Sequence, residues 1–242
     1  MRHVSVMSLT SSVGLMAIFL VDLIDVLFIS MLGQEALAAA AGYASTVMFF
    51  ASAMNIGLSV AAGVLVANSL GGGKPVPARE HAFSAAVFAI VLGILIPLIM
   101  LPNIELILGF LGATGHVAER AEAYLWIILP STFFSGIGMT TVASLRAYGD
   151  GRRAMYPSLA GALVNGVLDP IFIFALGMGL EGAAWATVAA RFATMLVALW
   201  PAFRLYNAFA IPRPGCFYWD EREGIQIATP AILATIATQI VI

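Results

Sequence analysis

Charged residues are scarce in this 242-residue chain. Asp, Glu, Lys and Arg make up 10% of it and hydrophobic residues 61%, whereas soluble domains have about 25% and about 45–50%. This composition excludes an ordinary water-soluble enzyme. The formal net charge is only −2, so neither a basic surface for nucleic acid nor an acidic tail explains it, and no nucleic-acid partner is expected. Membrane lipids are the expected surroundings.

Cysteine and histidine are also nearly missing. The single cysteine, Cys216, cannot form an intramolecular disulfide, and the chain has 3 histidines and no Asn-x-Ser/Thr glycosylation site. These counts exclude metal sites built from thiolates or imidazoles and give no sign of an extracellular folded domain. Any cation site must therefore be built from oxygen ligands.

Long hydrophobic runs make up most of the chain. A membrane-spanning helix needs about 20 mainly apolar residues. Six such stretches lie at 8–32, 41–70, 82–102, 121–146, 154–177 and 182–207. A seventh begins near residue 224. The sequence thus predicts an all-α integral membrane protein. Residues 1–208 would form a six-helix transmembrane lobe, 209–223 a cytoplasmic inter-lobe loop, and 224–242 the start of a seventh helix.

The distribution of Lys and Arg predicts the orientation in the membrane. When the N-terminus is placed inside, nine basic residues fall in the inner segments and one, Arg120, in an outer loop, with Arg191 left inside a helix. Basic residues accumulate in the cytoplasmic loops of membrane proteins. We therefore expect a multi-pass protein of the bacterial inner membrane with a cytoplasmic N-terminus.

Four charged side chains lie well inside the apolar stretches, away from their ends, where each costs roughly 2.5–3.5 kcal/mol on insertion scales: Asp22, Asp25, Asp169 and Arg191. Asp25 and Asp169 each lie eight residues before the glycine that ends an outward-running stretch, Gly33 or Gly177. At a rise of 1.5 Å per residue, this is a depth of about 12 Å below the outer surface for each. The two carboxylates are therefore expected at one level.

Two neutral polar side chains are expected near this level. Asn165 precedes Asp169 by one helical turn and shares its face, and Thr187 lies six residues after Glu181, about 9 Å deep. Pro170 cannot donate to the carbonyl four residues before it, so it is expected to kink the helix and free that carbonyl. Two carboxylates, an amide, a hydroxyl and a carbonyl suit Na⁺ or a shared proton. The alternative is a purely structural polar cluster that holds the helices together.

Asp22 and Arg191 form a second possible set. Asp22 and Asp25 are three residues apart and project from one face of a helix, so the residues alone do not decide which of them binds a cation. Arg191 lies at a depth similar to that of Asp22. We expect Asp22 and Arg191 to form an ion pair, either directly or through water.

Two glycine-rich motifs do not predict nucleotide binding. Residues 177–182 read G-x-G-x-x-G, but they follow a membrane helix and not a strand. After Gly72-Gly73-Lys74, Pro75 stands where a phosphate-binding loop needs the Ser or Thr that holds magnesium. We expect no enzymatic activity and no cofactor apart from a transported Na⁺ or H⁺.

Several motifs resemble those of the MATE (multidrug and toxic compound extrusion) family, and its DinF-like branch in particular. They are 25–33 (DVLFISMLG) with 36–39 (ALAA), 145–150 (LRAYGD), Asn165 with 168–170 (LDP), and 182–187 (GAAWAT). The resemblance implies a twelve-helix antiporter with two six-helix lobes, of which this chain would be the N-terminal half without the C-terminal lobe. It also implies export of small organic compounds in exchange for Na⁺ or H⁺.

The resemblance further implies which residues hold the coupling cation: Asp25, Asn165, Asp169 and Thr187. Methionine and aromatic side chains in the apolar stretches suit a cationic or lipophilic substrate. Two other functions stay open. One is a flippase for lipid-linked oligosaccharides or peptidoglycan precursors, from the same superfamily, for which a cavity rich in Arg and Lys would be expected. The other is a non-transporting membrane scaffold, in which the polar side chains only join helices.

Overall fold

The computed structural model describes residues 2–31, 35–210 and 216–240, with side chains described from residue 12 onward except at 15, 18, 22, 216–223 and 238–240. These residues form helices joined by short turns and contain no strand. The helices are α1 (Arg2–Met31), α2 (Glu35–Gly71), α3 (Pro75–Met100), η1 (Leu101–Asn103), α4 (Ile104–Phe110), α5 (Gly115–Ile128), η2 (Leu129–Ser131), α6 (Thr132–Ala147), α7 (Gly151–Pro170), η3 (Ile171–Ala175), α8 (Gly179–Arg204) and α9 (Cys216–Ile240).

Within the described part of the chain, six helical segments are long and apolar enough to cross a membrane. They are Ser12–Met31, Glu35–Gly71, Pro75–Phe110, Gly115–Ala147, Gly151–Ala175 and Gly179–Arg204. Each of the six predicted stretches overlaps one of these segments. The structure therefore confirms the predicted all-α membrane architecture.

The ends of several segments differ from the prediction. The stretch expected at 121–146 begins at Gly115, and its helix is interrupted by η2, which contains Pro130. Proline lacks an N–H and clashes with the carbonyl four residues earlier, so the chain tightens locally into a 3₁₀ turn. Pro102 does the same in η1. Near the other end of the chain, α9 begins at Cys216, within the expected loop at 209–223.

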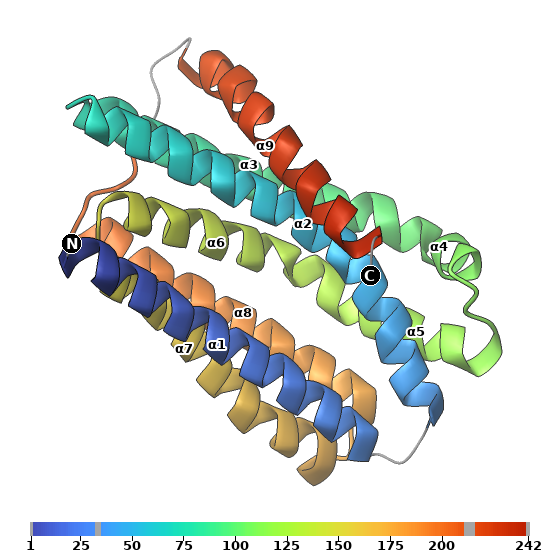
Figure 1. The fold of residues 1–242 in the computed structure, drawn as a ribbon. Coiled ribbons are helices and arrows are strands. Elements are labelled where there is room, and N and C mark those ends of the chain that lie inside the picture. The colour runs from blue at the N-terminus through green and yellow to red at the C-terminus, as the bar shows by residue number, and fades with distance from the viewer. Residues whose placement is uncertain (1, 32–34, 211–215, 241–242) are drawn as a thin grey trace.

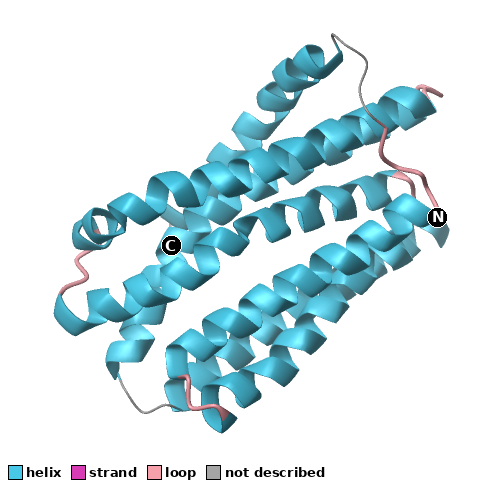
Figure 2. Ribbon diagram, turned by 180° about the vertical axis from the view of Figure 1, so that it is seen from behind, coloured by secondary structure: helices cyan, strands magenta, loops and turns pink. Residues whose placement is uncertain are grey.

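The helices form two groups that lie side by side (Figure 1). In one, α1 packs mainly on α7, and α7 on α8; in the other, α2 packs on α3 and α6. Contacts of α6 with α8 and of α5 with both α2 and α8 join the two groups. Figure 1 shows α9 on the outside of the bundle, where it contacts α2, and in the view from behind the other helices cover much of it (Figure 2).

Glycines allow the closest helix crossings. A side chain at Gly93 of α3 would overlap the backbone of Phe133 in α6, and one at Gly161 of α7 would overlap Thr194 of α8. Lipid offers no hydrophobic drive for helix association, so close van der Waals packing at small residues supplies much of it. These two glycines therefore allow close packing of α3 on α6 and of α7 on α8.

The G-x-G-x-x-G motif has a structural role here. Gly177 and Gly179 adopt positive φ angles of 66° and 57° in the tight turn between η3 and α8, a conformation that glycine adopts without strain. A Cβ at the third glycine, Gly182, would lie 2.8 Å from the carbonyl oxygen of Phe172 in η3. The motif thus seats the start of α8 against η3.

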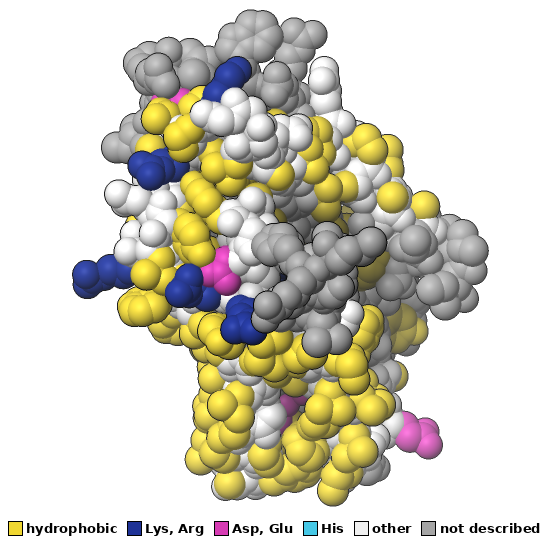
Figure 3. Space-filling view, turned by 60° about the vertical axis from the view of Figure 1, so that its left-hand side comes forward, with side chains coloured by type: hydrophobic (Ala, Val, Ile, Leu, Met, Phe, Trp, Pro, Cys, Tyr) yellow, Lys and Arg dark blue, Asp and Glu magenta, His cyan; other side chains and the backbone are white. Residues whose placement is uncertain are grey.

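Charge is unevenly distributed over the surface. On the face shown in Figure 3, Lys and Arg side chains gather on one part, while hydrophobic side chains form nearly all of the lower part. Exposed large hydrophobic side chains are frequent along the spanning helices, among them Phe19, Leu98 and Trp200. Such a surface is stable only against lipid or another apolar partner.

A hydrogen-bonded corner closes the turn between α6 and α7. Asp150 accepts from the backbone N–H of Arg153 at 3.0 Å, which caps α7, and from its guanidinium at 2.7 Å. The Tyr206 hydroxyl, which follows α8, also donates to Asp150. Partial burial raises the pKa of Asp150, but the hydrogen bonds from Tyr206 and Arg153 outweigh burial, and the net pKa is lowered.

Removing this carboxylate by Asp150→Ala is expected to lower the free energy of unfolding by about 1–2 kcal/mol at pH 7, chiefly through the lost helix cap. Because the folded pKa lies below the ordinary value of about 3.9, the contribution is fully present above that value and is lost as the pH falls through the folded pKa. Thermal unfolding in detergent at pH 7 and at pH 3 measures both effects. If the difference in melting temperature between wild type and Asp150→Ala were larger at pH 3 than at pH 7, the lowered pKa of Asp150 would be wrong.

Candidate functional site

The candidate site begins with two acids and an amide from α1 and α7. Asn165 and Asp169 lie one turn apart on α7, and only 4% and 0% of their surfaces are exposed. The Asn165 side-chain amide donates to Asp169 Oδ2 at 2.6 Å and, more weakly, to Asp25 Oδ1 on α1 at 3.4 Å. The structure thus brings Asp25, Asn165 and Asp169 together, as expected from the depths of the two acids and from the spacing of Asn165 and Asp169 on one helix.

The second carboxylate oxygen of Asp169 has no hydrogen-bond partner among the described residues. Oδ1 is buried and accepts no hydrogen bond within the described part of the chain, and no ion pair found there includes Asp169. A buried charged group without a partner costs more than the roughly 1–3 kcal/mol of a neutral one. A proton or a cation on this oxygen would remove that cost.

The number of acids favours a singly charged ion. Among the described residues there is no group of three or more His, Cys, Asp and Glu side chains that could hold a metal ion. Calcium and magnesium sites generally collect more oxygen ligands and charge than two carboxylates and an amide provide. The donor set fits Na⁺ or H⁺ better.

The helix is distorted directly after this pair, at Pro170. From Ile171 to Ala175 the chain forms the π-helical segment η3. Proline cannot extend the regular hydrogen-bond ladder, and π-helical turns occur frequently at functional sites. The structure therefore shows a widened turn on the outer side of Pro170, while the expected kink and the free carbonyl four residues earlier stay predictions.

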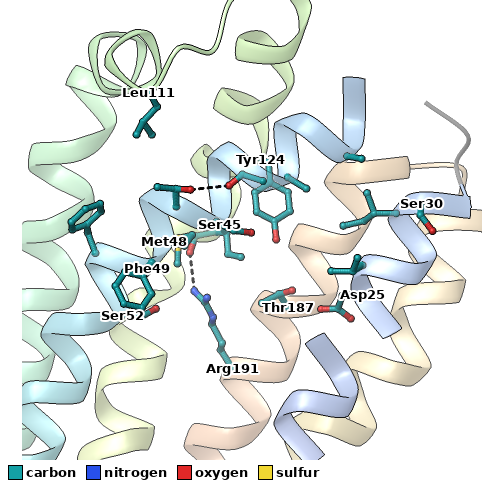
Figure 4. A pocket seen from close by; sticks show the side chains of 18 of the residues that line it. Asp25, Ser30, Ser45, Met48, Phe49, Ser52, Leu111, Tyr124, Thr187 and Arg191 are labelled. Atoms are coloured by element: carbon teal, nitrogen blue, oxygen red, sulfur yellow. Dashed lines mark hydrogen bonds between the residues drawn. The ribbon is translucent and has the colours of Figure 1, made fainter. Parts of the chain in front are cut away.

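Thr187 reaches the same region from α8, although it is not hydrogen-bonded to the acids. Its hydroxyl donates to the carbonyl of Ala183, one turn earlier on its own helix, at 3.0 Å. Thr187 and Asp25 both line a cavity, which leaves the threonine oxygen able to accept from, or bind, a group in that space (Figure 4).

The cavity has a volume of about 1000 Å³ and is lined by residues of α1, α2, α5 and α8, by Leu111 after α4 and by Ile236 of α9. Its apolar lining includes Met48, Phe49 and Phe50 of α2. Its charged groups lie on α1 and α8, and Figure 4 shows the side chains of Asp25 and Thr187 beside this space. Asp25 is half-buried at the cavity wall, while Asn165 and Asp169 lie behind it.

Sequence reasoning missed Tyr124. This residue of α5 lines the cavity together with Asp25, Thr187 and Arg191. The predicted span began at residue 121, which placed Tyr124 near the surface. The helix in fact begins at Gly115, nine residues earlier than Tyr124, so at 1.5 Å per residue the tyrosine lies about 13 Å along it, at the depth of the two acids.

Arg191 also lines the cavity. Its Nη1 donates to Ser131 Oγ at 2.8 Å and to the Ile128 carbonyl at 3.3 Å, so it contacts the helix break at η2. The expected ion pair with Asp22 stays a prediction because the Asp22 side chain lies outside the described residues.

Comparison with known proteins gives consistent matches. The MatE family model matches residues 11–171. The chain is 30% identical over 155 residues to the probable multidrug resistance protein NorM of Thermotoga maritima, covering 62% of this chain and 33% of that protein. It is also 30% identical over 187 residues to the FAD transporter of Shewanella oneidensis, covering 75% of this chain and 41% of that protein.

Solved structures show the same architecture. A MOP superfamily transporter from Pyrococcus furiosus superposes with a TM-score of 0.91 at 27% sequence identity, covering 99% of this chain and 53% of that one. The chain therefore spans about half of that structure, and less than half the length of the two curated relatives.

Proposed function

Because the chain belongs to the MatE family of transporters, we propose that it is the N-terminal lobe of an antiporter of the inner membrane. This antiporter exports an organic compound in exchange for Na⁺ or H⁺. The observation that carries the proposal is Asp169 Oδ1, which is buried beside a second acid and accepts no hydrogen bond from the described residues. The matches do not favour the flippase or the scaffold.

The cation enters this site from the cavity. Asp25 is half-exposed to that space, whereas Asp169 is fully buried behind it. A cation leaving water therefore meets Asp25 first and passes to Asp169, with Asn165 holding the two carboxylates in place. The Thr187 hydroxyl oxygen supplies a further ligand from α8.

Binding of the cation changes the charge between α1 and α7. Two ionised acids at this depth cost roughly 5–7 kcal/mol together, at about 2.5–3.5 kcal/mol each. Neutralising them removes most of that cost and changes the contact between α1 and α7 that Asn165 bridges. Because the organic substrate occupies the cavity that Asp25 lines, cation and substrate compete, which is the requirement for exchange.

Cation binding is tested by tryptophan fluorescence. Trp185 lies two residues before Thr187 on α8 and is half-exposed, so its emission is expected to respond saturably when NaCl replaces choline chloride or when the pH is lowered. Asp169→Asn is expected to abolish the response. Glu105→Gln, which removes an exposed carboxylate from α4, is the matched control and is expected to keep it.

Two outcomes decide the result. A Trp185→Phe variant without the signal assigns it to the reporter near the site. If the Asp169→Asn protein shows a response with the wild-type midpoint, then Asp169 does not hold the cation and the proposed mechanism is wrong.

A further inference from the structure

A buried asparagine lies next to the break in the fourth membrane-spanning segment, Gly115–Ala147. Asn55 of α2 is only 1% exposed, and its side chain lies against Gly136 of α6. Gly57, two residues further along α2 and so on nearly the opposite side of the helix, is the residue that contacts α9. Asn55 therefore faces into the bundle, where an amide needs hydrogen-bond partners.

Only one half of the Asn55 amide has a partner. Nδ2 donates to the carbonyl oxygen of Thr132, the first residue of α6, at 3.2 Å. Oδ1 is buried and accepts no hydrogen bond from the described residues. A buried acceptor without a partner destabilises a protein, so its presence in a native structure needs an explanation.

The unused oxygen lies beside the first hydrogen bond of α6. In an α-helix, the N–H of Gly136 donates to the carbonyl of Thr132, four residues earlier. Asn55 Oδ1 is so close to Gly136 that a Cβ built there would lie 2.8 Å from it, and Nδ2 already holds the Thr132 carbonyl. The amide thus places a donor at one end of this helical hydrogen bond and an acceptor near the other.

This turn of α6 follows a weak point in the segment. The short helix η2 contains Pro130 and separates α5 from α6. On the outer side of the break, α5 contributes Tyr124 and Ile128 to the wall of the cavity. On the inner side, α6 packs on α2, α3 and α8. A bend at the first turn of α6 would therefore move the cavity wall while α6 keeps its place.

We propose that Asn55 is the hinge residue of this segment. When α5 bends relative to α6, the hydrogen bond between Gly136 and Thr132 opens, and the Asn55 amide bonds to both freed backbone groups. Helices kink where a side chain enters their hydrogen-bond ladder, and a break within a membrane requires partners for the freed groups. Asn55 Oδ1 is the acceptor kept for the bent state. The inference rests on the proposed function, because the moving wall belongs to the proposed substrate cavity.

Spin labels at the outer ends of α2 and α5 provide the test. Glu35 and Glu119 are exposed there, and Lys74 and Arg146 are exposed at the inner ends of α3 and α6. Each pair is changed to cysteine in the full-length protein without other cysteines, and double electron–electron resonance in nanodiscs gives the distances. In choline chloride, in NaCl and at low pH, wild type is expected to populate two outer distances and one inner distance.

Asn55→Leu keeps the approximate shape of the side chain but has neither donor nor acceptor. It is expected to lower the population of the second outer distance about tenfold or more, as the loss of two hydrogen bonds provides. Gly136→Ala is expected to have the same effect, because the added Cβ displaces Oδ1. Asn68→Leu makes the same substitution at an exposed position of α2 and is the matched control, expected to keep the wild-type populations.

Several results would overturn the hinge. One is a single outer distance in wild type under all three conditions, which needs no variant to be folded. Another is a second distance that persists in Asn55→Leu while the melting temperature falls, because Asn55 would then only stabilise the fold. An equal effect of Asn68→Leu, or a change of the inner distance in Asn55→Leu, would indicate general loosening. Absence of the Trp185 response to Na⁺ and pH in wild type would instead refute the cation site, so the two failures are distinguishable.

Discussion

Replacing Asp169 by asparagine is expected to reduce cation-driven efflux to the level of liposomes without protein. The substitution removes the charge but keeps an oxygen that can accept the hydrogen bond from Asn165, which is 2.6 Å long in the native protein. The helix contacts should therefore persist while the site loses its affinity for Na⁺ or H⁺. Asp25→Asn is expected to have the same effect, because Asp25 is the carboxylate that meets the cavity.

The measurement is dye efflux from liposomes that contain the full-length protein, driven either by a Na⁺ gradient or by a pH gradient. The gradient that drives wild-type efflux identifies the coupling ion. Glu105→Gln, which removes a carboxylate far from the site, serves again as the control. The yield and the melting temperature of each variant show whether it is folded. Coupled efflux at the wild-type rate in Asp169→Asn would rule out the mechanism.

The largest effect on stability is expected from Gly93→Ala. A Cβ at Gly93 would overlap the backbone of Phe133, and backbone cannot move aside as a flexible side chain can. Overpacking of this kind costs about 1–3 kcal/mol. The separation of α3 from α6 would also weaken the hydrogen bond from Thr132 Oγ1 to the Gly93 carbonyl, which is 3.3 Å long.

Thermal unfolding in detergent measures the loss, with Gly109→Ala as the matched control. A Cβ at Gly109 of α4 would meet no atom within 4 Å, so alanine is expected to be neutral there or to stabilise by up to about 0.5–1 kcal/mol. Equal melting temperatures for the two variants would show that the crossing at Gly93 tolerates a methyl group and is not close-packed.

The sequence was sufficient for the architecture and for the proximity of Asp25, Asn165 and Asp169. Hydropathy located the spans, and counting residues from Gly33 and Gly177 placed Asp25 and Asp169 at one depth, where the structure joins them through Asn165. This worked because a helix has a fixed rise, so a reliable end defines the depth of every residue near it.

Other features could not be predicted in this way. Tyr124 was missed because polar residues such as Glu119, Arg120 and Glu122 hid the start of α5 at Gly115. The cavity depends on which faces of several helices meet, and periodicity carries little information about that when helices are apolar on all sides. The same limit applies to Arg191, whose contacts with η2 depend on a proline break in a distant segment.

The widened turn η3 determines which side chains α1 meets near the membrane surface. Phe174 in η3 packs edge-on against Phe28, three residues beyond Asp25, with ring centroids 5.8 Å apart and planes at 87°. A regular helix turns by about 100° per residue, so an uninterrupted α-helix after Pro170 would carry the Phe174 ring to a different azimuth. The contact between Phe174 and Phe28 therefore depends on the widened turn after Pro170. Rewinding that turn into a regular α-helix would move the Phe174 ring away from Phe28 and so remove this contact between η3 and α1.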